Sequence, residues 1–187
     1  MGWMDHRAYY QDIARKIDGS VIVTTKDHWL WRALAWALYL VTCGWGMKPE
    51  VFLTEYATTI GPVQGYPREW PELHEETIVH ESGHTRQARW FGLGIHPWVG
   101  LLPMAIAYLL LPLPVGLAYV RYILELGADK RRWRYMLDHG ASPAEIVVRA
   151  SSFGRTVSSK AYGWAWPWAE KGFAEAAQRM ISSHRGP

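Results

Sequence analysis

The sequence has a single cysteine and little net charge, and these two shortages exclude several classes of protein. Its 187 residues include one Cys, 20 Lys and Arg, and 17 Asp and Glu, which leaves a formal charge of +3. One thiol forms no disulfide within the chain, so nothing in the sequence indicates an oxidising compartment. A nucleic-acid-binding protein needs clustered basic residues, so we expect no nucleic-acid partner.

The sequence also lacks a secretory signal and a long uninterrupted apolar run. Residues 1–16 are rich in charge, which predicts no signal peptide and a cytoplasmic protein. The apolar segment Trp29–Cys43 is too short for a membrane span and indicates a buried helix. The segment Pro97–Val120 carries no formal charge over 24 residues, but four prolines interrupt it. We expect two short buried helices and a proline-rich corner there, with membrane contact as the second choice.

Aromatic residues are, by contrast, abundant, with 12 Trp and 10 Tyr in the chain. Rings in such number suit a lipid interface, a broad binding surface or a closely packed core. Trp164, Trp166 and Trp168 alternate near the C-terminus, which would place all three rings on one side of an extended segment. We expect them to anchor this segment to the core, and a hydrophobic wall beside a cleft is the alternative.

Turn and cap residues divide the chain into an opening helix, a short β region and a helical second half. Strands are expected at Val21–Thr24 and Val51–Ile60, the second returning as a hairpin through Tyr66. The expected helices are Arg7–Ile17, Pro71–Phe91, a long helix that starts between Val115 and Tyr119 and ends at His139, one that starts at Ser142, and Glu170–Ser182. This order predicts an α+β fold with a small mixed or antiparallel sheet. With 49% hydrophobic residues, the chain is long enough for one domain over residues 1–187.

One motif carries chemistry, the HExxH sequence of residues 80–84. On a helix, His80 and His84 stand one turn apart on the same face, so both imidazoles can point at one cation, as Zn²⁺ requires. Glu81 lies about 100° round the helix, where it can act as general base on a water activated by the metal.

A third ligand decides the class of metal site. Glu125 is the best candidate, because it lies on the second predicted long helix and Asp129 stands one turn after it. One of these carboxylates can bind the metal while the other orients a ligand imidazole. His96 does not complete an HExxHxxGxxH pattern, because Gln87 replaces the glycine. The position of Cys43 is more consistent with a buried thiol at a helix end than with a metal ligand.

HESGH followed by ELGAD resembles the gluzincin metallopeptidases, whose pattern is HExxH and then ExxxD on a second helix. The order of strand and hairpin before the motif is similar to that of the zincin catalytic subdomain. The resemblance spans roughly residues 21–139 and implies a zincin-like fold. It implies that His80, His84 and Glu125 bind Zn²⁺, that Glu81 is the general base, and that Asp129 holds His80. It also implies that an edge strand pairs with an extended peptide substrate.

The chain departs from this family at two points. Leu124 stands where gluzincins often have Asn, so the partner of His84 is unassigned. The residue that stabilises the oxyanion is also open, with Tyr162, His139 and Arg121 as candidates. The segments TTIG and LLPLPVGLAY give a weaker resemblance to metallopeptidases of tailed phages, some of which are virion components. The location is therefore expected to be cytoplasmic or virion-associated.

The sequence thus predicts a zinc metallopeptidase that acts on a peptide or protein substrate. Residues 20–140 would form the catalytic core, and residues 141–187 a helical, Trp-rich extension. The alternatives are a structural or virion-associated protein that keeps the fold and docks to a larger assembly, and a membrane-associated metallopeptidase. The basic run Lys130–Arg134 is expected to be a solvated helix end, with phosphate or headgroup contact as the alternative.

Overall fold

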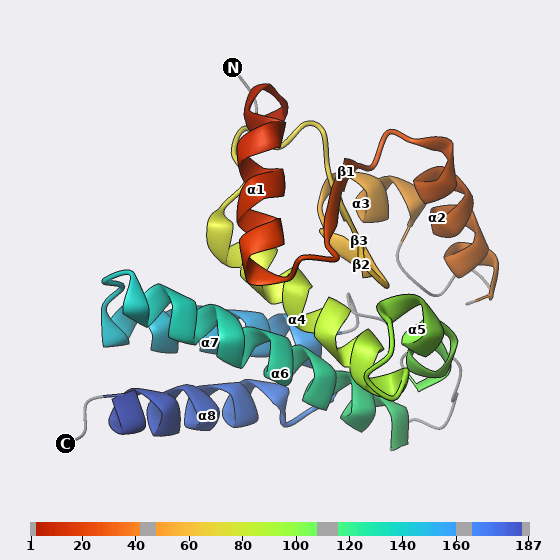
Figure 1. Ribbon diagram of the computed structural model, residues 1–187. Coiled ribbons are helices and arrows are strands. Elements are labelled where there is room, and N and C mark those ends of the chain that lie inside the picture. The colour runs from red at the N-terminus through yellow and green to blue at the C-terminus, as the bar shows by residue number, and fades with distance from the viewer. Residues whose placement is uncertain (1–2, 42–47, 108–115, 160–165, 185–187) are drawn as a thin grey trace. The chain divides into compact units, whose positions relative to one another are not determined.

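The computed structural model describes residues 3–41, 48–107, 116–159 and 166–184, and it is α+β, mostly helical with one small mixed sheet (Figure 1). The chain forms two compact units, Met1–Met104 and Ala105–Pro187. The first contains a short 3₁₀ helix η1 (Trp3–His6), α1 (Arg7–Ile17), β1 (Ile22–Thr25), α2 (Trp29–Val41), α3 (Pro49–Thr54), β2 (Thr58–Ile60), β3 (Val63–Tyr66), α4 (Glu75–Phe91) and α5 (Pro97–Ala105). The second contains α6 (Gly116–Asp138), α7 (Pro143–Ser158) and α8 (Ala169–His184).

The sheet has three strands in the order β1-β3-β2. Strand β3 runs parallel to β1, with Ile22 opposite Val63, and antiparallel to β2, with Ile60 opposite Val63. Gly61 occupies the turn between β2 and β3 with a φ of 57°, a conformation that glycine adopts without strain. The predicted first strand, the hairpin through Tyr66 and the small mixed sheet are therefore confirmed.

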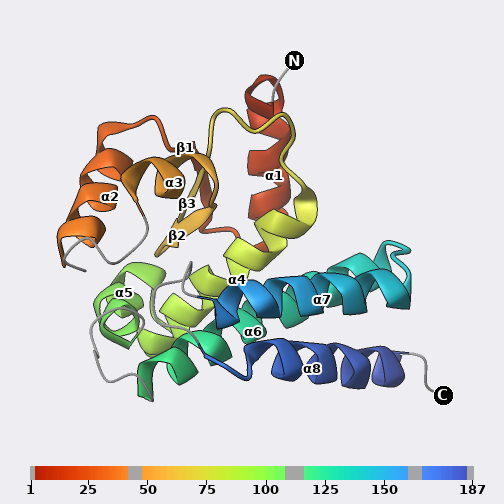
Figure 2. The same ribbon diagram turned by 180° about the vertical axis from the view of Figure 1, so that it is seen from behind.

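Alternate residues of the sheet face two different helical layers, which Figures 1 and 2 show on opposite sides of the strands. Tyr66 on β3 packs with Val23 of β1 and Ile78 of α4, in a core that α1 also joins. Val63 on the same strand packs with Trp31 of α2, in a smaller core that α3 joins through Phe52. The strand pair that carries the hairpin is thus covered on both faces.

An ion pair links α1 to α4 on the first of these faces. Both guanidinium ends of Arg89 bond to the carboxylate of Asp18, at 3.0 and 2.9 Å, and Arg89 also donates to Ser20. Asp18 is 7% exposed and caps the C-terminus of α1. Burial opposes ionisation of this carboxyl, but the hydrogen bonds from Arg89 and Ser20 and the charge of Arg89 outweigh it and lower the pKa of Asp18.

The predicted strand Val51–Ile60 is wrong over its first half. Residues Pro49–Thr54 form helix α3, and the strand is confined to Thr58–Ile60. Pro49 is the first helical residue and Glu50 follows it in the first turn, which are the residue types that start a helix. The helix buries Phe52 against α2, and this packing outweighs the β propensity of the segment.

The two apolar helices predicted to be buried are only partly so. In α2, Trp31 and Ala35 are buried, but Trp29, Leu30, Trp36 and Leu40 are exposed. In α5, only Pro97 and Gly100 are buried, and Trp98, Val99 and Leu102 are exposed. No helix in the described parts of the chain is both long and apolar enough to cross a membrane. Cys43 and residues 108–115 lie outside the described residues.

Helix α5 turns back onto the end of α4 at a point where two glycines meet. A Cβ on Gly100 would overlap the carbonyl of Ala88 and the backbone of Gly92, and a Cβ on Gly92 would lie 2.7 Å from the nitrogen of Gly100. Gly92 ends α4, as the sequence predicted for its C-cap. The contact is therefore made by backbone against backbone, with no room for side chains.

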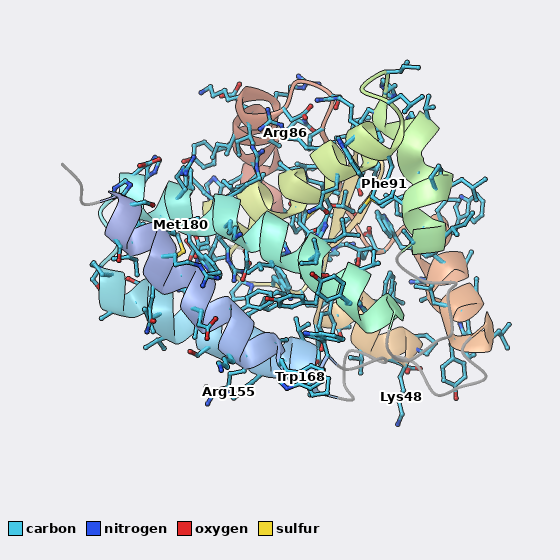
Figure 3. The ribbon with its side chains drawn as sticks, turned by 90° about the horizontal axis from the view of Figure 1, so that it is seen from below. Lys48, Arg86, Phe91, Arg155, Trp168 and Met180 are labelled. Carbon is cyan, nitrogen blue, oxygen red and sulfur yellow. The ribbon has the colours of Figure 1, made fainter. Side chains whose placement is uncertain are left out.

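The second unit is a three-helix core around Trp133 and Phe173, both fully buried. Helix α7 begins as predicted, because the hydroxyl of Ser142 accepts a hydrogen bond from the amide of Glu145. Trp166 stacks on Tyr122 of α6 and so anchors the start of α8, whereas Trp168 is exposed (Figure 3). The third ring of the predicted strip, Trp164, lies outside the described residues.

Candidate metal centre

Helix α4 carries the HExxH motif. It starts at Glu75, with Glu75 and Glu76 at the positive end of the helix dipole, and residues 71–74 precede the helix, contrary to the predicted start at Pro71. His80, Glu81 and His84 are 6%, 6% and 8% exposed. The centroids of the two imidazole rings lie 5.0 Å apart with an angle of 81° between their planes, so both rings occupy the same face of α4. The predicted juxtaposition of the two histidines is confirmed.

Glu125 on α6 completes a group of three metal-binding side chains. One possible ligand atom from each of His80, His84 and Glu125 lies within 4.8 Å of the others, and all three residues are buried. This is the one such group of His, Cys, Asp and Glu among the described residues. Two imidazole nitrogens and a carboxylate oxygen are donors that zinc and other divalent transition metals accept. The three residues therefore lie close enough to bind a metal ion.

His84 has a partner that the sequence left unassigned. Its Nδ1 lies 2.9 Å from the side-chain oxygen of Gln87, one turn further along α4. An amide oxygen only accepts, so Nδ1 carries the hydrogen and Nε2 keeps its lone pair for a cation. The i, i+3 spacing of these two residues on one helix is the signal in the sequence that indicates this contact.

Thr59 of the sheet binds the carboxylate of Glu81. The hydroxyl of Thr59 on β2 donates to Oε2 of Glu81 at 2.6 Å and lies 3.2 Å from the carbonyl oxygen of the same residue. No other described side chain donates to this carboxylate, so its Oε1 is not engaged in this way. The sequence gives no local signal for this contact, because Thr59 lies 22 residues before Glu81.

A second, fully buried link joins the sheet to the residue after Glu81. Tyr66 donates to Oε1 of Gln64 at 2.6 Å, and Nε2 of Gln64 donates to Ser82 at 3.0 Å. Burial raises the pKa of Tyr66 well above its usual value, and the charge of Glu81 adds to this effect, so the phenol stays a neutral donor. The bond from Gln64 to Ser82 joins β3 to α4 within the motif, and the bond from Tyr66 orients the Gln64 amide that makes it.

Asp129 is completely buried and bonds to Arg132, whose Nη2 lies 2.9 Å from one carboxylate oxygen and 3.1 Å from the other. The basic run Lys130–Arg134 is therefore not solvated throughout, because the Arg132 side chain turns towards the interior of its unit. The role predicted for Asp129, holding His80, stays a prediction. Of the other candidates, His139 is exposed and contacts the carbonyl of Tyr135, while Tyr162 lies outside the described residues.

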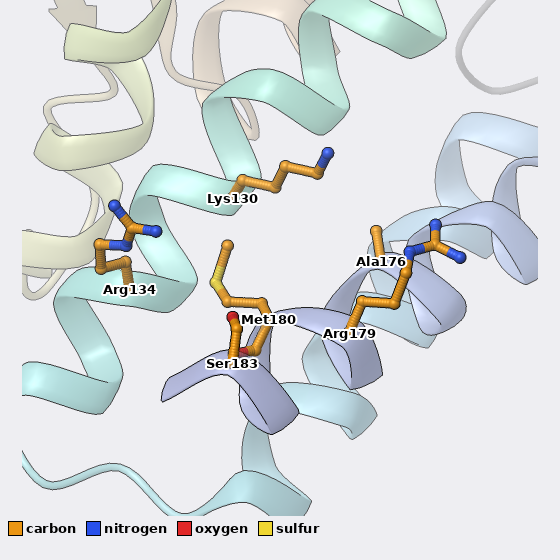
Figure 4. Close-up of a pocket in the computed structure, with 6 residues that line it drawn as sticks. All are labelled: Lys130, Arg134, Ala176, Arg179, Met180 and Ser183. Atoms are coloured by element: carbon orange, nitrogen blue, oxygen red, sulfur yellow. The ribbon is translucent and has the colours of Figure 1, made fainter. Parts of the chain in front are cut away.

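Lys130 and Arg134 of the same run lie on the other side of α6. With Arg179 and Ser183 of α8 they line an open hollow of about 220 Å³, which Ala176 and Met180 also line (Figure 4). None of the predicted site residues belongs to it. The hollow is a basic feature of the surface of the second unit.

Lys26 is a buried cation near Glu81 that the sequence did not single out. It is 2% exposed, and its Nζ donates to the carbonyl of Phe52 at 2.7 Å and to the hydroxyl of Thr58 at 2.6 Å. Burial lowers the pKa of Lys26 to about 7, although the charge of Glu81 acts in the opposite direction. A single Lys after a short strand carries no recognisable pattern, so only the tertiary structure reveals it.

The chain matches no protein-family model, and comparisons with curated proteins and with solved structures also give no match.

Proposed function

We propose that the protein is a zinc-dependent hydrolase of peptide bonds, of the gluzincin type and with a zincin-like fold. The observation that carries this proposal is the buried group of His80, His84 and Glu125, with ligand atoms within 4.8 Å of one another. The sequence order HExxH and then ExxxD supports the same class. An intact set of donors favours a hydrolase over a structural protein that merely keeps the fold.

His80, His84 and Glu125 would hold the zinc ion, since two histidines and a glutamate form one of the ligand sets of catalytic zinc, with a further position left open. Bound there, zinc supplies Lewis-acid chemistry, which polarises a carbonyl and lowers the pKa of water to about 7. Gln87 prepares His84 for this role by accepting the hydrogen on Nδ1 at 2.9 Å.

Glu81 is the general base in this proposal. Thr59 donates to its Oε2 at 2.6 Å, which orients the carboxylate and leaves Oε1 to accept a proton from the attacking water. The same oxygen then returns the proton to the leaving amine. Ser82, bonded to Gln64, keeps the helix turn that carries Glu81 against the sheet.

The substrate would be an extended peptide that adds to strand β2. This strand is at the edge of the described sheet, and Thr58–Ile60 are only partly buried. An edge strand offers unpaired backbone donors and acceptors, which is the usual way in which an extended peptide is bound. Thr59 belongs to this strand, so the strand that would bind the substrate also carries the residue that orients the Glu81 carboxylate.

The test is the zinc content of the purified protein together with turnover of a mixed peptide library. We expect one zinc per wild-type chain, loss of zinc in Glu125→Ala and His84→Ala, and retained zinc with at least about 100-fold lower turnover in Glu81→Gln. Glu175→Ala, which removes an exposed carboxylate of α8, is the matched control and should change neither. Unchanged zinc in Glu125→Ala would refute the ligand set, and full turnover in Glu81→Gln would refute the mechanism.

A further inference from the structure

The ammonium group of Lys26 contacts aromatic rings as well as hydrogen-bond acceptors. Besides its two hydrogen bonds, Nζ lies 3.7 Å from the ring centroid of Phe52 and 5.7 Å from that of Trp31. A protonated amine in this position gives charge-assisted hydrogen bonds and a cation–π contact, all stronger than those of a neutral amine. Its protonation state therefore changes how tightly Phe52 and Thr58 are held.

The residue that Lys26 binds on β2 is next to the residue that binds Glu81. Thr58 accepts from Lys26 at 2.6 Å, and Thr59 donates to Glu81 at 2.6 Å. Neighbouring residues of a strand point to opposite faces, so Lys26 binds β2 on one face and Glu81 of α4 binds it on the other. A shift of β2 at Thr58 would therefore also move Thr59 and the carboxylate of Glu81 that Thr59 binds.

The two charges also act on each other. Of the titratable groups in the described residues, Glu81 of α4 is the one whose charge affects Lys26. The other elements around Nζ present the neutral groups already named: the ring of Trp31 on α2, the ring and carbonyl of Phe52 on α3, and the hydroxyl of Thr58 on β2. The backbone carbonyl of Tyr66 on β3 accepts from the backbone amide of Lys26 at 3.0 Å, and the Tyr66 side chain stays a neutral phenol. Glu81, 6% exposed, therefore has a buried countercharge in Lys26.

We propose that Lys26 is a positioning residue of the candidate site, a buried cation that fixes the edge strand β2 and, through it and through its charge, the carboxylate of Glu81. The protonated form is the one that holds the site in its working arrangement. This inference rests on the proposed function for its effect on catalysis, while its effect on β2 can be measured without any turnover. Because the pKa of Lys26 is about 7, the hold on β2 weakens as the pH rises through neutrality.

The first readout is independent of activity. Hydrogen exchange measured by NMR at pH 6 should show protection factors for the Thr58–Ile60 amides at least about 10-fold lower in Lys26→Met than in wild type. In wild type the same factors should fall between pH 6 and 8.5, in step with the titration of the labelled Lys26 side chain, while Lys26→Arg, which stays charged, should keep them constant. Lys16→Met, which removes an exposed lysine of α1, is the matched control and should leave them unchanged.

The second readout is the pH profile of kcat for a peptide substrate. We expect the wild type to lose activity above pH 7, Lys26→Arg to retain it at higher pH, and Lys26→Met to have at least about 10-fold lower kcat with its zinc content intact. Unchanged protection of β2 in Lys26→Met, or a Lys26 that titrates at the usual value for lysine, would overturn the inference. If the wild type binds zinc and shows the exchange effects but cleaves no peptide, the proposed function fails and the role of Lys26 in holding β2 stands.

Discussion

Nδ1 of His84 and the side-chain oxygen of Gln87 lie 2.9 Å apart, one turn from each other on α4. This contact determines which nitrogen of His84 can bind a cation, since the hydrogen on Nδ1 leaves the lone pair on Nε2. It also restricts rotation of the ring before any metal arrives. The partner of this ligand therefore comes from its own helix.

Replacement of Gln87 by alanine should weaken zinc binding without unfolding the protein. The loss of an outer partner of a ligand histidine lowers metal affinity by roughly 10- to 100-fold. The affinity can be measured by competition with a chromophoric chelator. Gln178→Ala, which changes an exposed glutamine on α8, is the control. An affinity equal to that of wild type in Gln87→Ala would show that the contact does not prepare His84.

The ion pair between Asp18 and Arg89 should make stability depend on acid pH. The pKa of Asp18 is lower in the folded than in the unfolded chain, so the contribution is fully present above about pH 4 and is lost as the pH falls through the lower folded pKa. In Asp18→Asn this part of the pH dependence should disappear. Urea unfolding at a series of pH values from 2 to 6 measures the free energy of unfolding. The same dependence of this free energy on pH in both proteins would contradict the assignment.

Arg89→Met should destabilise the protein at neutral pH by roughly 2 to 4 kcal/mol, because it leaves a buried carboxylate without its partner. The Arg89 side chain is 32% exposed, which keeps the loss below that of a fully buried pair. Lys16→Met, which breaks an exposed pair with Asp12, should lower the free energy of unfolding far less than Arg89→Met does, because solvent screens the pair. Equal losses in the two variants would show that α1 and α4 do not depend on this ion pair.

Gly65→Ala should destabilise the sheet by about 1 to 3 kcal/mol, the usual cost of overpacking. A Cβ at this position of β3 would overlap the indole ring of Trp31, which is buried against the same face. The double variant Gly65→Ala with Trp31→Phe should recover part of the loss, because the smaller ring makes room. Gly19→Ala, where a Cβ meets nothing within 4 Å, is the control in urea unfolding. A loss of stability in Gly19→Ala as large as that in Gly65→Ala would contradict this reasoning.

Much of the helical structure could be predicted because its signals are local. Helix α1 spans the predicted Arg7–Ile17, and Ser142 caps α7 as expected. The grouping of His80 and His84 follows from helical spacing alone, and Glu125 was found from a pattern on a second helix.

The rest depends on contacts between distant residues. Helix α3 was mistaken for a strand because β-branched and aromatic residues suit both a strand and a short packed helix, and packing of Phe52 decides between them. Thr59 and Lys26 were missed for the same reason. A threonine in a strand and a lysine after one acquire a role only when the hairpin meets α4.

The contact between Gly92 and Gly100 offers a way to recognise remote relatives. Because backbone meets backbone where α5 turns onto α4, neither position tolerates a side chain while this turn is kept. The two glycines follow the second motif histidine at regular intervals, Gly92 eight residues after His84 and Gly100 eight residues after that. A search pattern that joins HExxH to this glycine spacing is more selective than the five-residue motif. It selects for the close turn of α5 onto α4 as well as for the candidate metal ligands.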